Sequence, residues 1–135
     1  MSALAFLLAV PMREPDFSLI VPGGTWLNAN DGKAWYHNAG PVRAWRDAGA
    51  WTARAMKVPH MRRAYVLAEI QFPDLRRNDP ANWYPTVKPV IDGLVDARVL
   101  PDDSGKHLLG PDIRLGRPLS GITSKRLTVH LWRLE

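Results

Sequence analysis

Apolar residues alternate with polar or larger ones along three stretches of the chain, and this period of two predicts β-strands. The three stretches are residues 17–21, 64–72 and 125–134. A shorter apolar stretch at residues 107–109 is a fourth candidate. In the two longest strands we expect one apolar face to pack into the core, formed by Val66, Ala68, Ile70, Phe72, Leu127, Val129 and Leu131.

Two other stretches repeat their apolar residues every third or fourth position, which is the period of an α-helix. The first helix is predicted over residues 42–56, and its Gly49 lowers helix propensity by about 1 kcal/mol relative to alanine. The second contains Pro85 and Pro89, so we place its N-cap at Thr86, which keeps Pro89 in the first turn where no N–H is needed. Its predicted apolar stripe is Val87, Val90, Ile91, Leu94 and Val95.

Turn-forming residues separate these elements and complete the predicted fold. A polar loop before the first helix carries Trp26, Trp35 and Tyr36, which either cap the core or stack on DNA, and we favour the core. A Gly-Pro-Asp turn is predicted at residues 110–112, followed by an exposed basic loop over residues 114–121. The predicted fold class is α+β, a single small domain with a mixed sheet of about four strands and two main helices.

The chain has 135 residues, of which 46% are hydrophobic, and this is enough to build one compact domain with a core. We assign the domain to residues 16–135 and treat residues 1–15 as an N-terminal extension or arm. The apolar run at residues 1–10 is far shorter than the roughly 20 residues that span a bilayer, and it lacks the features of a signal peptide. Together with the absence of cysteine, this favours a cytoplasmic protein without a membrane partner.

Positive charge dominates the sequence, with 18 Lys and Arg residues against 13 Asp and Glu, a net charge of +5. A basic domain of this size has an electrostatic reason to bind nucleic acid, although a basic structural protein without that role has the same composition. The four histidines are scattered without the spacing of zinc ligands. No glycine-rich nucleotide-binding loop is present in the sequence, so no organic cofactor is expected.

The residues best suited to chemistry gather between positions 76 and 103. Lys88 falls in the first turn of the predicted second helix, where its charge and the helix dipole together favour a phosphate. Asp92 follows four positions later, so the two side chains can touch. The tandem carboxylate Asp102-Asp103 closes the segment. Carboxylates, a lysine and arginines are the groups that hold a divalent metal beside a phosphate.

Three groups of residues in this segment form a recognisable pattern. They are Arg76-Arg77-Asn78-Asp79-Pro80-Ala81-Asn82, Lys88-Pro-Val-Ile-Asp92 and Asp102-Asp103, with Asp103 at the expected distance after Asp92. The pattern resembles the RusA family of Holliday junction resolvases, which are small phage- and prophage-type endonucleases. The resemblance covers about a fifth of the chain.

This resemblance implies a homodimer that recognises four-way DNA junctions and nicks two strands of like polarity, with Mg²⁺ as its cofactor. Residues 16–135 would then form a RusA-like endonuclease domain. The implied catalytic residues are Asp79, Lys88 and Asp103. The implied metal ligands are Asp79, Asp103, Asp102 and Asp92, and the implied DNA-binding residues are Arg76, Arg77, Asn82 and Lys88.

The sequence departs from the family pattern at two points. Ala81 stands where the family has a second metal-binding aspartate, and three extra residues separate the first group from the second. Water, Asp102, Asp92 or Glu69 could replace the lost ligand, since Mg²⁺ normally keeps several waters. Alternatively, the chain is a catalytically weakened protein that binds branched DNA without cutting it.

Overall fold

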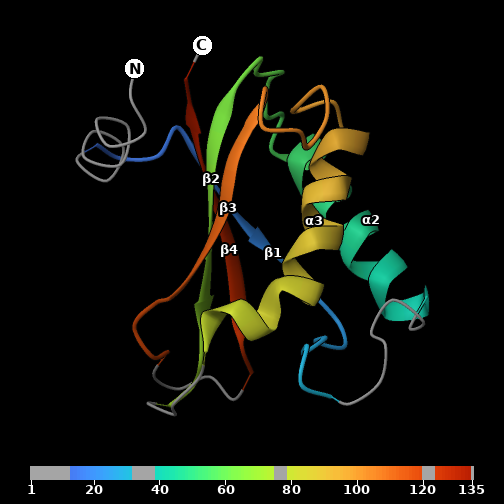
Figure 1. The fold of residues 1–135 in the computed structure, drawn as a ribbon, viewed down its shortest axis with the longest axis vertical. Helices are drawn as coiled ribbons and strands as arrows, with labels where there is room; N and C mark the ends of the chain where they lie inside the picture. Colours follow the sequence, from blue (N-terminus) through green and yellow to red (C-terminus); the bar gives the residue numbers. More distant parts are fainter. Residues whose placement is uncertain (1–12, 32–38, 75–78, 120–123, 135) are drawn as a thin grey trace.

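A four-stranded mixed sheet organises the described part of the chain, which is residues 13–31, 39–74, 79–119 and 124–134 of a computed structural model (Figure 1). β4 is antiparallel to both of its neighbours, whereas β2 and β3 run parallel. The strands, in the spatial order β1-β4-β2-β3, are β1 (Phe17–Val21), β4 (Arg126–Arg133), β2 (Ala64–Gln71) and β3 (Leu108–Leu115). The architecture confirms the predicted α+β class and the positions of the strands predicted at residues 17–21, 64–72 and 125–134.

The two α-helices of the described residues lie on one face of this sheet (Figure 1). α2 spans Ala39–Ala55, and α3 spans Tyr84–Asp96 directly after a short 3₁₀ helix, η3 (Pro80–Trp83). Neither α-helix is long and apolar enough to cross a membrane. The core between sheet and helices contains the predicted apolar faces, although Val95 is only partly buried. The other predicted core residues are each at most 6% exposed: Val66, Ala68, Ile70, Phe72, Val87, Val90, Ile91, Leu94, Leu127, Val129 and Leu131.

Glycine on each helix allows α2 and α3 to approach closely. A Cβ added to Gly49 of α2 would lie 2.8 Å from the Val90 carbonyl oxygen, and one added to Gly93 of α3 would lie 2.8 Å from the Ala50 nitrogen. Protein atoms do not pack this closely without displacement of the backbone. Gly49 therefore has a packing role that its low helix propensity does not reveal.

The second helix begins earlier than the sequence pattern predicts, so the assignment of Thr86 as its N-cap is wrong. α3 starts at Tyr84, and Pro89 lies inside the helix. The buried Thr86 hydroxyl instead donates to the Leu27 carbonyl at 2.8 Å and accepts from the Leu27 N–H at 2.8 Å, which ties the helix to a distant loop. As a further consequence, Lys88 lies in the second turn of α3 and not in the first. The helix dipole acts most strongly within the first turn.

β3 occupies two segments that the sequence pattern predicts as turn and loop. They are the turn at residues 110–112 and the first part of the basic loop over residues 114–121. Pairing with β2 supplies backbone hydrogen bonds that the local pattern does not indicate. The strand accommodates the irregular sequence by a register shift opposite the Tyr65–Leu67 portion of β2. Gly110 there has a φ of 103°, which glycine adopts at little cost.

The sheet face turned away from the helices carries a second apolar cluster and a polar network. Tyr65 and Trp132 pack with their ring centroids 5.3 Å apart, and both are buried. Beside them, the His130 ring hydrogen-bonds to Ser18 at 2.8 Å and to Glu69 at 3.2 Å, linking three strands. Glu69 is therefore directed away from the helices and from the residues that they carry.

The end of the predicted N-terminal extension that the structure describes, residues 13–15, lies beside β4. The Trp132 indole N–H donates to the Arg13 carbonyl at 2.9 Å, and the Arg133 N–H donates to the Asp16 carboxylate at 2.6 Å. Residues 1–12 lie outside the described residues.

Replacing Gly93 with alanine should destabilise the protein by about 1–3 kcal/mol, because the added methyl group forces α2 and α3 apart. Gly40→Ala is the matched control, since Gly40 is also helical but a Cβ there meets nothing within 4 Å. Urea unfolding, followed by tryptophan fluorescence, should show the loss for Gly93→Ala alone. Equal stabilities of the two variants would contradict a glycine-dependent helix contact.

Candidate functional site

Lys88 of α3 lies between two carboxylates from different segments. Its Nζ atom is 2.6 Å from Asp92, one turn further along the helix, and it also donates to Asp103 in the loop that follows α3. The predicted contact between Lys88 and Asp92 is thus confirmed, and the fold adds Asp103 to it. We call these three residues the lysine–aspartate cluster.

Two buried residues at the start of the loop 97–107 hold it against α3. Val99 and Leu100 are 0% and 1% exposed, so the loop is part of the core at this point. The Val99 N–H donates to the Leu94 carbonyl at 2.9 Å, and the Val99 carbonyl accepts from the Met61 N–H at 2.7 Å. This anchoring brings the tandem carboxylate back toward the helix.

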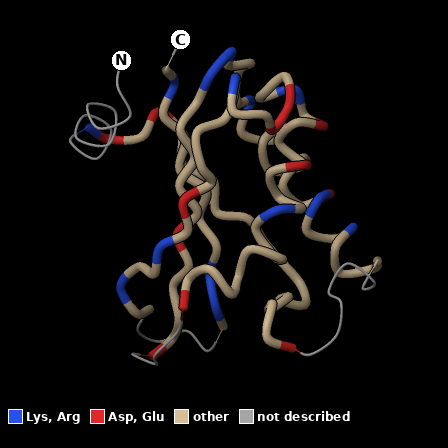
Figure 2. The backbone as a smooth tube through the Cα atoms, in the orientation of Figure 1, with Lys and Arg blue, Asp and Glu red and all other residues tan. Residues whose placement is uncertain are grey.

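Charge pairing fixes the ionisation of the lysine–aspartate cluster. Burial alone would lower the pKa of the Lys88 ammonium, but hydrogen bonds to Asp103 and Asp92 outweigh it and the pKa is raised. The hydrogen bond from Lys88 and its positive charge lower the pKa of Asp103. The three side chains remain 28%, 32% and 46% exposed for Lys88, Asp92 and Asp103, so an anionic ligand can reach them from solvent. Figure 2 shows acidic and basic positions interspersed along α3 and the loop after it.

Asp102 lies beside this cluster and has partners of its own. One of its oxygens accepts from the Ser104 N–H at 2.8 Å, and the other lies 3.9 Å from the His107 ring. Hydrogen bonds from Ser104 lower the pKa of Asp102. The structure thus places Asp102 as the residue that shapes the turn carrying Asp103.

Asp79 and Asn82 are brought to η3, before α3 begins. The Asp79 carboxylate caps η3 by accepting from the Ala81 N–H at 3.0 Å, and the Asn82 carbonyl accepts from the Ala29 N–H at 2.8 Å. Figure 1 shows η3 and the loop after α3 near opposite ends of that helix. The predicted site residues therefore fall into two groups, one around Lys88 and one on η3. Arg76 and Arg77, the predicted arginines, lie outside the described residues.

The chemistry of the lysine–aspartate cluster fits a magnesium ion held by few protein ligands. Among residues 13–31, 39–74, 79–119 and 124–134, no three His, Asp or Glu side chains are grouped to hold a metal. However, Asp92 and Asp103 converge closely enough for one ammonium to contact both. One or two carboxylates, with water and substrate phosphate, are the usual ligands of Mg²⁺ in phosphate-transferring sites. Glu69 does not contribute here, because it pairs with His130 on the other face of the sheet.

An aromatic cluster at the end of β2 is a feature that the sequence pattern does not reveal. The Trp26 ring lies edge-on to Trp45 and Trp83, with centroids 5.1 and 5.8 Å away, which supports its predicted role in capping the core. The Lys125 ammonium lies above the Trp83 ring at 5.1 Å. Trp35 and Tyr36 lie outside the described residues. The Trp26, Trp45 and Trp83 rings and Lys125 come from four separate segments, so local periodicity could not identify the cluster.

No protein-family model matches the sequence, and no curated protein matches it. A function for the chain therefore has to be argued from the chemistry of its own residues.

Acid should weaken the fold, and part of this loss should come from Asp103. Because its pKa is lowered in the folded protein, its charge contributes stability above the unfolded pKa of about 3.9, and this contribution disappears as the pH falls through the lower folded-state value. Asp103→Asn should therefore lose less stability than the wild type between about pH 5 and pH 2, measured by urea unfolding.

Asp47→Asn is the control for this experiment, because it removes an exposed carboxylate that pairs with Arg43 on α2, outside the cluster. If Asp103→Asn and the wild type lose stability equally over this pH range, the ion pair with Lys88 does not stabilise the folded state.

Proposed function

We propose that this chain is a magnesium-dependent endodeoxyribonuclease that resolves four-way DNA junctions, acting as a homodimer in DNA recombination and repair in the cytoplasm. The observation that carries the proposal is the lysine–aspartate cluster. Its members belong to the second and third groups of the RusA-like pattern, and the folded chain brings these groups into contact. A net charge of +5 also favours DNA as the partner.

In the proposed enzyme Lys88 binds the scissile phosphate. Its ammonium now neutralises Asp92 and Asp103, and an incoming phosphate competes with these carboxylates for the same charge. When the Lys88 ammonium pairs with the phosphate instead, Asp92 and Asp103 become available to hold Mg²⁺. Bound there, Mg²⁺ would supply an activated water and neutralise charge that develops on the phosphate during hydrolysis.

The remaining predicted residues position the DNA in this proposal. Arg76 and Arg77 would contact phosphates of the junction arms, with Asn82 adding a polar contact from η3, and such binding weakens strongly with salt. Asp79 would keep η3 in place through its hydrogen bond to the Ala81 N–H.

A synthetic four-way junction incubated with the wild type and Mg²⁺ should yield paired symmetric nicks. Asp103→Asn should reduce cleavage by about a hundredfold or more, because loss of a metal-binding carboxylate costs several kcal/mol of transition-state stabilisation. Chelation of the metal should abolish the product. Asp47→Asn, which changes charge by the same amount away from the cluster, should cut like the wild type. A folded wild type that yields no product with any divalent metal would refute the nuclease.

A second candidate function is binding of branched DNA without cleavage. It is favoured by Ala81, which replaces an aspartate of the family pattern, and by the separation of Asp79 from the lysine–aspartate cluster. In that case the wild type should bind junctions tightly without metal and release no product.

Ala81→Asp tests this second candidate directly. If cleavage was lost through Ala81, the restored carboxylate should produce Mg²⁺-dependent cleavage where the wild type yields no product, since metal-bound charge lowers the reaction barrier. Ala81→Asn is the control, because it has a similar size without the charge. An increase for both variants would rule out metal binding as the cause.

A further inference from the structure

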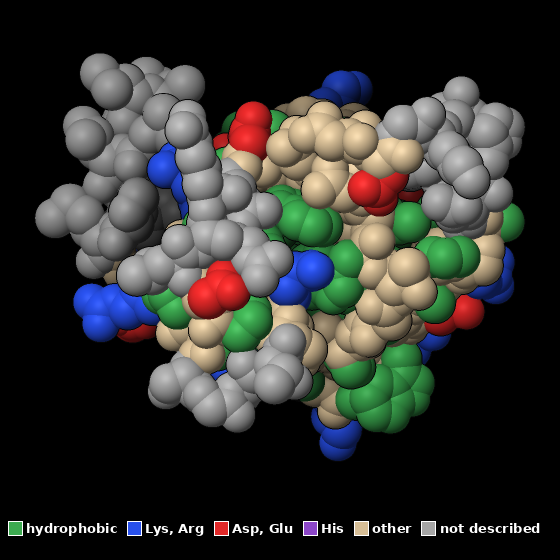
Figure 3. Space-filling model, turned by 90° about the horizontal axis from the view of Figure 1, so that it is seen from below, with side chains coloured by type: hydrophobic (Ala, Val, Ile, Leu, Met, Phe, Trp, Pro, Cys, Tyr) green, Lys and Arg blue, Asp and Glu red, His purple; other side chains and the backbone are tan. Residues whose placement is uncertain are grey.

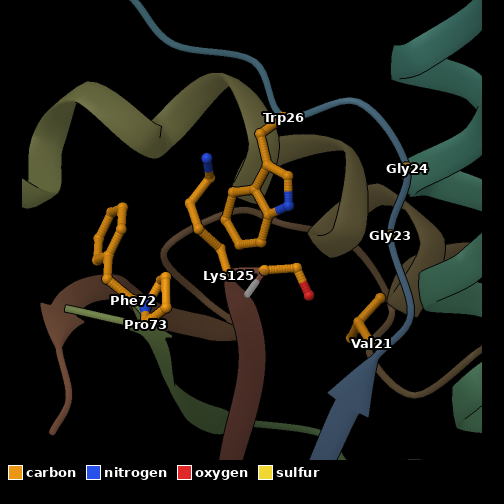
Figure 4. Close-up of a pocket in the computed structure, with 8 residues that line it drawn as sticks. Val21, Gly23, Gly24, Trp26, Phe72, Pro73 and Lys125 are labelled. Atoms are coloured by element: carbon orange, nitrogen blue, oxygen red, sulfur yellow. The ribbon is translucent and has the colours of Figure 1, made fainter. Parts of the chain in front are cut away.

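A small cavity opens at the end of the sheet where β1 and β2 finish and β4 begins (Figure 4). Its volume is about 280 Å³, just below the usual range of roughly 300–1,000 Å³ for small-molecule sites, so it admits a group about the size of one nucleobase. Its walls include Val21, Gly23, Gly24, Trp26, Phe72 and Lys125. In Figure 3, which views this end of the molecule, hydrophobic and basic side chains lie side by side on the surface.

Lys125 places a positive charge among aromatic rings in this cavity. Its Nζ atom is 5.1 Å from the Trp83 ring centroid, 5.5 Å from that of Trp26 and 5.8 Å from that of Phe72. Figure 4 shows the side chain extending between Phe72 and Trp26. Within the part of the chain that the structure describes, no carboxylate pairs with Lys125. Ring faces attract a cation but carry no net charge, so an anion can still bind it.

The aromatic wall is held in place before any ligand binds. Trp26 is fixed edge-on by Trp45 and Trp83, and the Trp45 indole N–H donates to the Thr25 carbonyl at 2.7 Å. Gly23 lies directly against the Trp45 ring, where any Cβ would overlap it. A rigid wall lowers the entropy cost of binding, because little has to be ordered when the ligand arrives.

We propose that this cavity binds a single unstacked nucleotide, with its base against the aromatic wall and its phosphate on Lys125. An apolar ring face beside a lysine that no described carboxylate pairs with matches the two chemical parts of a nucleotide, and stacking on aromatic side chains is tolerant of base identity. The binding of nucleotides itself is independent of cleavage. Only the source of the nucleotide, an unpaired base near a DNA branch point, rests on the proposed function.

The position of the cavity links it to the lysine–aspartate cluster. Trp83, beneath Lys125, is the last residue of η3, and α3 follows it immediately with Lys88 in its second turn. One continuous helical segment thus joins the cavity to the cluster. A strand whose unpaired base enters the cavity would run its backbone past η3 toward Lys88.

Binding of a fluorescently labelled single strand of six thymidines tests the proposal with the full chain carrying Asp103→Asn, so that no substrate is cut. Lys125→Met in this background should weaken binding about tenfold, within the range found for loss of a stacking or phosphate contact. Lys57→Met is the matched control, because Lys57 is exposed just after α2 and does not line the cavity. Lys125→Arg should retain most of the affinity.

Equal affinities for Lys125→Met and Lys57→Met would overturn the cavity proposal. If Lys125→Met does not fold, acetylation of Lys125 in the wild-type chain gives an independent reading. The bound oligonucleotide should slow its modification relative to Lys57, and equal rates would again contradict the proposal. If the protein cleaves junctions but both Lys125 tests are negative, only the cavity proposal is refuted. If Lys125-dependent single-strand binding is found without any junction cleavage, only the proposed nuclease function is refuted.

Discussion

The parallel pairing of β2 with β3 is the constraint on which the rest of the structure depends. Parallel neighbours cannot be joined by a tight turn, so the chain has to cross from the end of β2 back to the start of β3. That crossover contains η3, α3 and the loop after α3. The described residues between 79 and 103 that the sequence marks as chemical lie on it, which is why a structural connection also carries the candidate site.

Close packing determines where the crossover can lie. Gly49 and Gly93 let α3 settle against α2, and the ion pair between Arg46 and Asp96, at 2.6 Å, fastens the far end of α3 to the same partner. The hydrogen bonds that the Arg46 guanidinium donates to Asp96 lower the pKa of the Asp96 carboxyl, as expected for a charge that is held in a fixed pair. With α3 fixed at two points along α2, Lys88 has a defined position from which to meet Asp103.

Much of the fold could be predicted from the sequence because its signals are local. The alternation along β2 and β4 and the stripe from Val87 to Leu94 follow from burying one face of a strand or helix, and the core contains these residues. The errors arose where a distant partner outweighed a local preference. Thr86 bonds to Leu27 instead of capping α3, and Gly110 lies within a strand because β2 supplies its partners.

For the candidate site, the sequence by itself determined the residue types and the contact between Lys88 and Asp92, since four helical positions bring two side chains onto one surface. It did not determine which other carboxylate joins them. Only the tertiary structure decided that Asp103 meets Lys88 while Asp79 caps η3, because burial of Val99 and Leu100 sets the path of the loop. The physical reason is that helical spacing is fixed by the backbone, whereas the return of a loop depends on the core that it packs against.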